Sequence, residues 1–216
     1  MKDNAKTTRF VATVFSTGWA IYAVAQAPSP FNMVSTVISA VPALIGFALV
    51  AFDKWLWKWP GVNRLTGRPR IGGTWIARIT PGPGSRIPPG GNWGPIPAVI
   101  VIEQSFWSVH VRLYTAESES LSTTASMIPR GDGSEGQCLA SVYQNKPDPA
   151  HRDRSPIHEG ACNLNFIGRK PATADGNYWT DRLTAGGILI RLIDRKTDRG
   201  RLDCMALARQ QFNTAH

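Results

Sequence analysis

The sequence predicts a two-helix transmembrane hairpin at the N-terminus followed by an all-β domain, a compact, roughly eight-stranded antiparallel β-barrel. Two observations carry this prediction. Residues 10–52 form a run of 43 residues without Asp, Glu, Lys or Arg, interrupted near its middle by Pro28-Ser29-Pro30. Beyond Arg70 the chain consists of short β-branched or aromatic runs separated by Gly, Pro, Asn and Asp, a pattern typical of a sandwich or barrel.

The charge-free run is long enough for two membrane spans. A helix needs about 20 apolar residues to cross the hydrocarbon core. Residues 10–27 and 31–52 supply two such stretches, and the turn between them is short enough to require a hairpin. Basic residues precede the first span and follow the second, while the turn has none, so the positive-inside rule places both termini in the cytoplasm.

A cleaved secretory signal peptide is the alternative for the first span. Its charged region would hold Lys2, Lys6 and Arg9, and Ala25-Gln26-Ala27 resembles a small-residue cleavage site. Cleavage would leave the equally apolar second span unexplained, whereas a hairpin uses both spans. The hairpin is therefore the preferred interpretation.

The remaining chain carries excess positive charge close to the second span. From Asp53 onward there are 21 Lys and Arg against 14 Asp and Glu, and no acid lies between Asp53 and Glu103. This basic stretch is interleaved with Trp55, Trp57 and Trp59, which favours a collar at an anionic membrane surface over binding of a nucleic acid polymer. The predicted organisation is a cytosolic tail at 1–9, spans at 10–27 and 31–52, a Trp-rich basic linker at 53–70, and a cytosolic ligand-binding β-barrel at 71–210.

Eight strands are expected in the barrel, with a ninth near the C-terminus. Closure of such a sheet would remove its exposed edges. The Pro- and Gly-rich segment 81–97 and the polar segment 146–156 are expected to be loops. The expected strands are 73–79, 98–104, 106–116, 118–128, 138–144, 159–167, 177–183 and 187–195, with 203–209 as the ninth.

Cysteine and histidine spacing indicates no metal site and no disulfide framework. Cys138, Cys162 and Cys204 are odd in number and include no C-x-x-C pair, which suits a reducing compartment. The four histidines show no spacing typical of metal ligands. The chain also lacks a G-x-S-x-G nucleophile elbow and a P-loop, so no metal, no cofactor and no enzymatic activity are predicted.

Alternation within strands predicts which side chains share a face. Val109, Val111 and Leu113 share one face of their strand, with Arg112 on the other. Further along, the residues that share a face are Ser118, Ser120, Ser122, Thr124 and Ser126 in one strand and Tyr178, Thr180 and Arg182 in another. A shift of one residue in register would invert each assignment.

The order of short motifs along the chain resembles a known family. The motifs are Gly72-Gly73-Thr74-Trp75, Ser120-x-Ser122, Val142-Tyr143-Gln144-Asn145-Lys146-Pro147, His158-Glu159-Gly160 and Gly176-Asn177-Tyr178-Trp179-Thr180-Asp181-Arg182. Together with the two apolar spans, they resemble the two-transmembrane β-barrel effectors of CBASS anti-phage defence, the SMODS-associating, β-strand-rich family. The resemblance covers nearly the whole chain.

The resemblance implies a receptor and not an enzyme. In this family a cyclic-oligonucleotide synthase, or CD-NTase, makes a cyclic dinucleotide on infection, and the cytosolic barrel binds it. The protein then forms a homo-oligomer that disrupts the bacterial inner membrane by acting on its lipids, so that infected cells stop growing or die. The implied location is the inner membrane, with two spans and cytoplasmic N- and C-termini.

Candidate ligand contacts follow from the chemistry of a cyclic dinucleotide. Its phosphates require cations such as the Arg fork, and its bases require flat π surfaces such as Tyr. Trp75 is expected in the core. The candidates within the family motifs are Tyr143, Asn145, Tyr178, Thr180 and Arg182, and the second group is Arg112, Ser120 and Ser122.

Two other function classes remain open from the residues themselves. A membrane-anchored, lipocalin-like barrel would bind a small apolar ligand or lipid without killing the cell. A hydrolase with a site assembled across strands would escape a motif search. The polarity of the interior separates the first alternative from the nucleotide receptor, because inward-facing Arg, Tyr and Ser favour a nucleotide.

Overall fold

The computed structural model describes residues 14, 17–19, 21–22, 25, 30–129 and 136–213. The chain divides into two compact units, Met1–Val62 and Asn63–His216. In the first unit, α2 (Pro30–Lys54) is followed by the 3-10 turn η1 (Leu56–Lys58), in which Trp57 is buried. The short helix α3 (Pro60–Thr66) comes next in the chain.

The predicted membrane location is corrected by the structure. The first predicted span, 10–27, lies mostly outside the described residues, and the second, 31–52, lies within α2. A crossing needs both sufficient length and sufficient apolar character in one helix. Among the residues that the structure describes, no helix meets both requirements. This finding contradicts the prediction of a two-span inner membrane protein with cytoplasmic termini.

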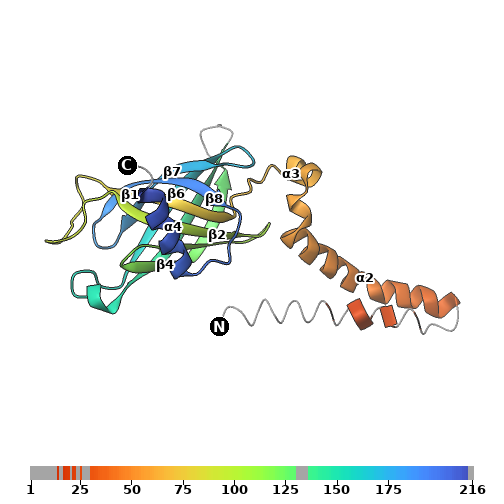
Figure 1. The fold of residues 1–216 in the computed structure, drawn as a ribbon. Coiled ribbons are helices and arrows are strands. Elements are labelled where there is room, and N and C mark those ends of the chain that lie inside the picture. Colours follow the sequence, from red (N-terminus) through yellow and green to blue (C-terminus); the bar gives the residue numbers. More distant parts are fainter. Residues whose placement is uncertain are drawn as a thin grey trace. The chain divides into compact units, whose positions relative to one another are not determined.

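The second unit contains the predicted antiparallel barrel. Each strand pairs with the next, and β8 returns to pair with β1, so the sheet closes (Figure 1). Closure pairs every strand on both sides and leaves no open edge. The strands are β1 (Gly73–Pro81), β2 (Ile96–Gln104), β3 (Val109–Tyr114), β4 (Ser118–Pro129), β5 (Gly136–Pro147), β6 (His158–Ile167), β7 (Thr173–Thr180) and β8 (Ala185–Asp194).

The predicted ninth strand is wrong, because residues 203–209 belong to helix α4 (Arg201–Asn213). Cys204 and Ala208 are buried, and their spacing of four places both on one helix face. They pack with Val99 and Tyr114 on the outside of the barrel, where α4 lies against β2 and β3 (Figure 1). This buried pair therefore has the four-residue spacing of a helix face and not the two-residue alternation of a strand.

A β-bulge interrupts the alternation in β4. Ser122 pairs with Tyr143 and Thr124 pairs with Val142, so Thr123 is the extra residue. An extra residue reverses which face the following side chains occupy. Beyond it, Ala125 packs against the barrel interior, whereas Ser126 is exposed. The predicted single stripe from Ser118 to Ser126 is therefore broken in two.

Large side chains fill one end of the barrel. Trp75 is fully buried, its indole Nε1 donates to the Ile71 carbonyl at 2.9 Å, and its ring meets Phe166 edge to face at 5.5 Å between centroids. Leu139 and Leu164 are also fully buried in the same cluster. The prediction that Trp75 belongs to the core is confirmed. Dense packing at this end leaves the opposite end of the barrel for a cavity.

Candidate functional site

A cavity of about 330 Å³ lies inside the barrel, at the end where β1, β3, β5 and β7 finish. Two loops contribute to its rim. Mouth loop A is residues 82–95, between β1 and β2, and mouth loop B is residues 148–157, between β5 and β6. Ile87 and Gly91 of mouth loop A and Arg154 and Ser155 of mouth loop B line the cavity. Two segments far apart in sequence thus bound the same opening.

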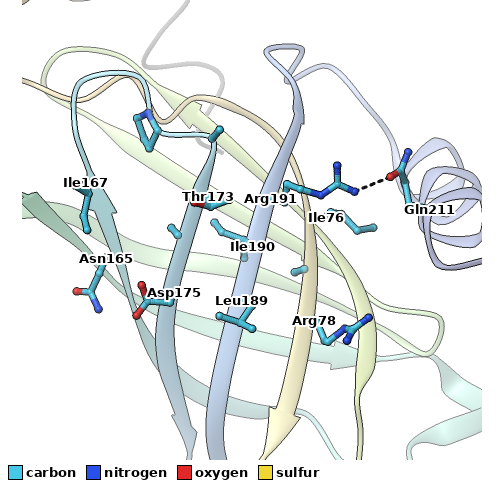
Figure 2. Close-up of a pocket in the computed structure, with 14 residues that line it drawn as sticks. Ile76, Arg78, Asn165, Ile167, Thr173, Asp175, Leu189, Ile190, Arg191 and Gln211 are labelled. Atoms are coloured by element: carbon cyan, nitrogen blue, oxygen red, sulfur yellow. Dashed lines mark hydrogen bonds between the residues drawn. The ribbon is translucent and has the colours of Figure 1, made fainter. Parts of the chain in front are cut away.

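A second, larger hollow of about 560 Å³ lies on the outer surface of the barrel. Figure 2 shows it across β6, β7, β8 and β1, with Leu189 and Asp175 on its floor and Gln211 of α4 at its margin. Arg191 donates from Nη2 to the Gln211 Oε1 at 2.8 Å there. None of the sequence-predicted site residues lines this groove. The internal cavity is therefore the candidate functional site.

Strand register places the inward side chains in rows across neighbouring strands. Ser120, Asn145 and His158 are cross-strand partners and form the row nearest the mouth. The next row contains Ser122, Tyr143, Gly160 and Thr180, and the deeper one contains Ser141, Cys162 and Tyr178. Because register is a property of the whole sheet, these residues meet although they come from four different strands.

Hydrogen bonds fix the row nearest the mouth. The buried Ser120 hydroxyl donates to the Asn145 Oδ1 at 2.9 Å, and the Asn145 amide lies 3.4 Å from the His158 Nε2. His158 Nδ1 lies 2.9 Å from the Pro156 carbonyl, which can only accept. Burial holds the pKa of His158 below its usual value, so the ring is neutral, with its proton on Nδ1 and an acceptor at Nε2. Hydrogen bonds thus connect Ser120, Asn145 and His158 across three neighbouring strands.

Two tyrosines supply aromatic surface to the cavity. The ring of Tyr143 extends over Gly160, where an added Cβ would lie 2.5 Å from the Tyr143 hydroxyl oxygen. Tyr178 lies one row deeper, and burial raises the pKa of both phenols, so both stay protonated. Within the described residues neither hydroxyl has a hydrogen-bonding partner, which leaves two donors available to a ligand.

Cationic and hydroxyl groups surround the mouth. Arg182 follows β7, lines the cavity, and donates from Nη1 to the Ser155 hydroxyl of mouth loop B at 2.6 Å. Thr180 and Thr184 face each other with their hydroxyl oxygens 2.8 Å apart. Within the described part of the chain, Arg182 has no carboxylate partner. A guanidinium without an acidic partner at a cavity mouth suits an anionic ligand group.

Six of the eight candidate residues predicted from the sequence line this cavity. They come together from β4, β5, β7 and the turn after β7, and all of them except Arg182 belong to the three rows described above. These residues are Ser120, Tyr143, Asn145, Tyr178, Thr180 and Arg182.

The other two candidates lie away from the cavity lining. Arg112 is on the outer face of β3, where Nη2 donates to the Glu103 carboxylate at 2.5 Å and to the Thr197 carbonyl at 2.8 Å. Ser122 is in a cavity row, but its hydroxyl accepts the Val111 amide at 2.9 Å and so extends the contact between β3 and β4. Both side chains are engaged in holding the fold.

Sequence analysis missed several residues of the lining. Arg154 and Ser155 lie in a segment that composition indicated only as a polar loop, and Ile87 lies in a loop to which no role was assigned. His158 belongs to the His158-Glu159-Gly160 motif, so the sequence did contain a signal for this residue. For Arg154 no local signal exists, because only the folded barrel brings mouth loop B to the cavity.

The chemistry of the lining does not include a metal site. Among the residues that the structure describes, no three His, Cys, Asp or Glu side chains are grouped to hold an ion. Cys138, Cys162 and Cys204 are free thiols. Cys162 lies 3.1 Å from the Ser141 hydroxyl, and burial raises the pKa of its thiol.

A closed barrel with one filled end and one polar, aromatic cavity has the architecture of a ligand-binding barrel. Comparison with known proteins agrees with this class. A family model described as "Cap15, cyclic dinucleotide receptor domain" matches residues 89–191, which run from mouth loop A into β8. A curated relative, the CD-NTase-associated protein 15 of Staphylococcus schleiferi, is 24% identical over 155 residues, covering 72% of this chain and 78% of the relative.

These matches confirm the resemblance predicted from the sequence and support a CBASS effector of the Cap15 type. The family description is that of a receptor, with a cyclic dinucleotide as ligand and not as cofactor. Apart from Ile87, the cavity residues singled out above lie within the matched region.

Proposed function

We propose that this protein is a receptor for a cyclic dinucleotide made by a CD-NTase, and that the ligand binds in the barrel cavity. The observation that carries the proposal is the convergence of Arg182, Tyr143 and Tyr178 with hydroxyl and amide groups on one cavity. A guanidinium matches a phosphate, and a phenol ring offers a stacking surface worth about 1–3 kcal/mol per base.

The dimensions of the cavity support a particular arrangement. About 330 Å³ is near the lower limit for small-molecule pockets. We propose that one base and its ribose enter between Tyr143 and Tyr178, while the phosphates remain at the mouth near Arg182. Asn145 and Ser120 are held by their mutual hydrogen bond and present fixed polar edges to the base. Thr180 lies in the same row as Tyr143 and is the expected hydroxyl contact.

Calorimetry tests the receptor role. The full chain would be titrated with cyclic di-GMP, cyclic di-AMP and cyclic GMP–AMP, and with the corresponding linear dinucleotides as controls. We expect one cyclic dinucleotide to bind, and Arg182→Gln to weaken that binding about tenfold or more, since a charge-assisted hydrogen bond is lost. Arg169→Gln is the matched control, because Arg169 is exposed at the filled end of the barrel. Absence of binding by folded protein would overturn the proposal.

The lipocalin-like alternative predicts an apolar interior. Apolar residues such as Ile100 and Ile188 do line the deeper part of the cavity, but the mouth carries Arg182 and Arg154. An anionic ligand therefore fits the lining better than a lipid chain. Displacement of a fluorescent fatty acid by the same ligands separates the nucleotide receptor from the lipid-binding barrel. A lipid-binding barrel would release the fatty acid only to apolar competitors.

We also propose that ligand binding drives homo-oligomerisation and that the oligomer disrupts a lipid bilayer and thereby arrests growth, as the family resemblance implies. We do not propose that the protein crosses the membrane with two spans. Sedimentation with and without the bound cyclic dinucleotide tests self-association. Dye release from phosphatidylethanolamine–phosphatidylglycerol vesicles tests bilayer disruption. A ligand-bound monomer, or vesicles that stay intact, would contradict the respective step.

A further inference from the structure

Arg154 is the second arginine at the cavity mouth, and its ion pair with Glu117 is exposed to solvent. It belongs to mouth loop B and lines the cavity. Its Nη2 donates to the Glu117 Oε1 at 2.6 Å and to the His151 Nδ1 at 3.1 Å, and its Nη1 approaches the Gly90 carbonyl at 3.5 Å. The side chains of Arg154 and Glu117 are 39% and 54% exposed. An ion pair this exposed contributes little stability, so it exchanges readily for a stronger partner.

Glu117 also lines the cavity, which gives the pair a second role. An exposed carboxylate beside the mouth repels an anionic ligand while it holds Arg154 in place. The two non-bridging oxygens of a phosphodiester, like the two oxygens of the carboxylate, can accept both donors of a guanidinium. When a ligand phosphate replaces the Glu117 carboxylate as the partner of Arg154, the positive charge of Arg154 therefore remains paired with an anion.

The same loop connects the two arginines of the mouth. Ser155, the neighbour of Arg154, accepts the hydrogen bond from Arg182 Nη1 at 2.6 Å. Arg182 lies in the turn after β7, while Arg154 lies between β5 and β6, so the two approach the cavity from separate loops. A cyclic dinucleotide carries two phosphodiesters, and two guanidinium groups from two loops match that number.

We infer that Arg154 is a second phosphate-binding residue and that Glu117 occupies its guanidinium until the ligand arrives. The inference rests on the proposed cyclic dinucleotide function. On binding, Arg154 leaves Glu117 for one phosphate and Arg182 takes the other, which draws mouth loop B over the ligand. The Arg154–Glu117 pair is thus a placeholder contact that competes with the ligand.

Variants at this pair test the inference with the cyclic dinucleotide that binds most tightly in the titration above. Arg154→Gln is expected to weaken binding about tenfold, and Arg154→Lys by less, because the charge remains while the bidentate fork is lost. Glu117→Gln is expected to tighten binding about threefold, since the competitor is removed. Arg152→Gln is the matched control in the same loop; Arg152 is absent from the cavity lining and donates from Nε to the Pro147 carbonyl.

The double variant separates competition from simple repulsion. If Glu117 acts through Arg154, the gain from Glu117→Gln disappears in the Arg154→Gln background. An equal gain in both backgrounds would overturn the placeholder role. Unchanged binding by Arg154→Gln, with binding by the wild type intact and weakened by Arg182→Gln, would overturn the inference and leave the receptor function standing. Absence of wild-type binding would overturn both.

Discussion

Ser120 of β4 donates its hydroxyl proton to Asn145 Oδ1 of β5 across 2.9 Å, and both side chains are buried at the cavity end of the barrel. The two residues are cross-strand partners. The amide group of Asn145 then has its nitrogen free to contact His158. One asparagine therefore links three strands, and the shape of the cavity wall depends on it.

Asn145→Ala is expected to destabilise the fold by about 1–3 kcal/mol, because it leaves the buried Ser120 hydroxyl without an acceptor. The measurement is the free energy of unfolding from a urea titration. Asn177→Ala makes the same chemical change at an exposed position and should leave the unfolding free energy close to wild type. Equal stability of the two variants would show that the Ser120–Asn145 bond does not support the wall.

Gly160→Ala is expected to disturb both stability and ligand binding. The new Cβ would meet the Tyr143 hydroxyl oxygen at 2.5 Å and the Trp179 carbonyl oxygen at 2.9 Å, so the tyrosine ring must move. Overpacking of this kind costs about 1–3 kcal/mol. Gly84→Ala is the control, since nothing lies within 4 Å of its added Cβ. Thermal unfolding and the calorimetric titration would be compared, and wild-type values in both would contradict the packing of Tyr143 over Gly160.

Trp75→Ala is expected to reduce stability by about 3–5 kcal/mol, because a large aromatic side chain is removed from the filled end of the barrel. The loss includes the hydrogen bond to the Ile71 carbonyl and the edge contact with Phe166. Trp93→Ala, at a position 57% exposed, tests the same truncation outside the core. Urea unfolding of both variants gives the comparison, and similar midpoints would exclude a core role for Trp75.

Stability is expected to fall as the solution is acidified, through His158. Burial lowers the pKa of His158 in the fold, Arg182 lowers it further, and Pro156 and Asp181 oppose the shift. The unfolded chain then binds the proton more readily than the folded one, so stability is greatest above about pH 6.5 and is lost as pH falls toward the folded-state pKa. Measurement of the free energy of unfolding at several pH values across this range gives the slope of stability against pH.

His158→Gln should remove that part of the pH dependence, since glutamine does not titrate. His110→Gln, on the outer face of β3, should retain it. A slope that survives in His158→Gln would assign the dependence to another group.

The sequence alone predicted a roughly eight-stranded antiparallel barrel and six of the side chains that line the candidate cavity. Alternation is a local property with a period of two residues, so Tyr178, Thr180 and Arg182 were placed on one face before any pairing was known, and all three line the cavity. Gly and Pro clusters marked the loops for the same local reason. The membrane location inferred from the apolar run at residues 10–52 was wrong. The segment 203–209 was predicted as a strand but is helical.

Only the tertiary structure decided which face of each strand points inward and which loops reach the cavity. The bulge at Thr123 reverses the faces of β4, and closure between β1 and β8 completes the wall. Arg154 meets Glu117 from 37 positions away, and no local pattern predicts that contact. The physical reason is that register and closure depend on hydrogen bonds between distant strands, whereas sequence periodicity describes one strand at a time.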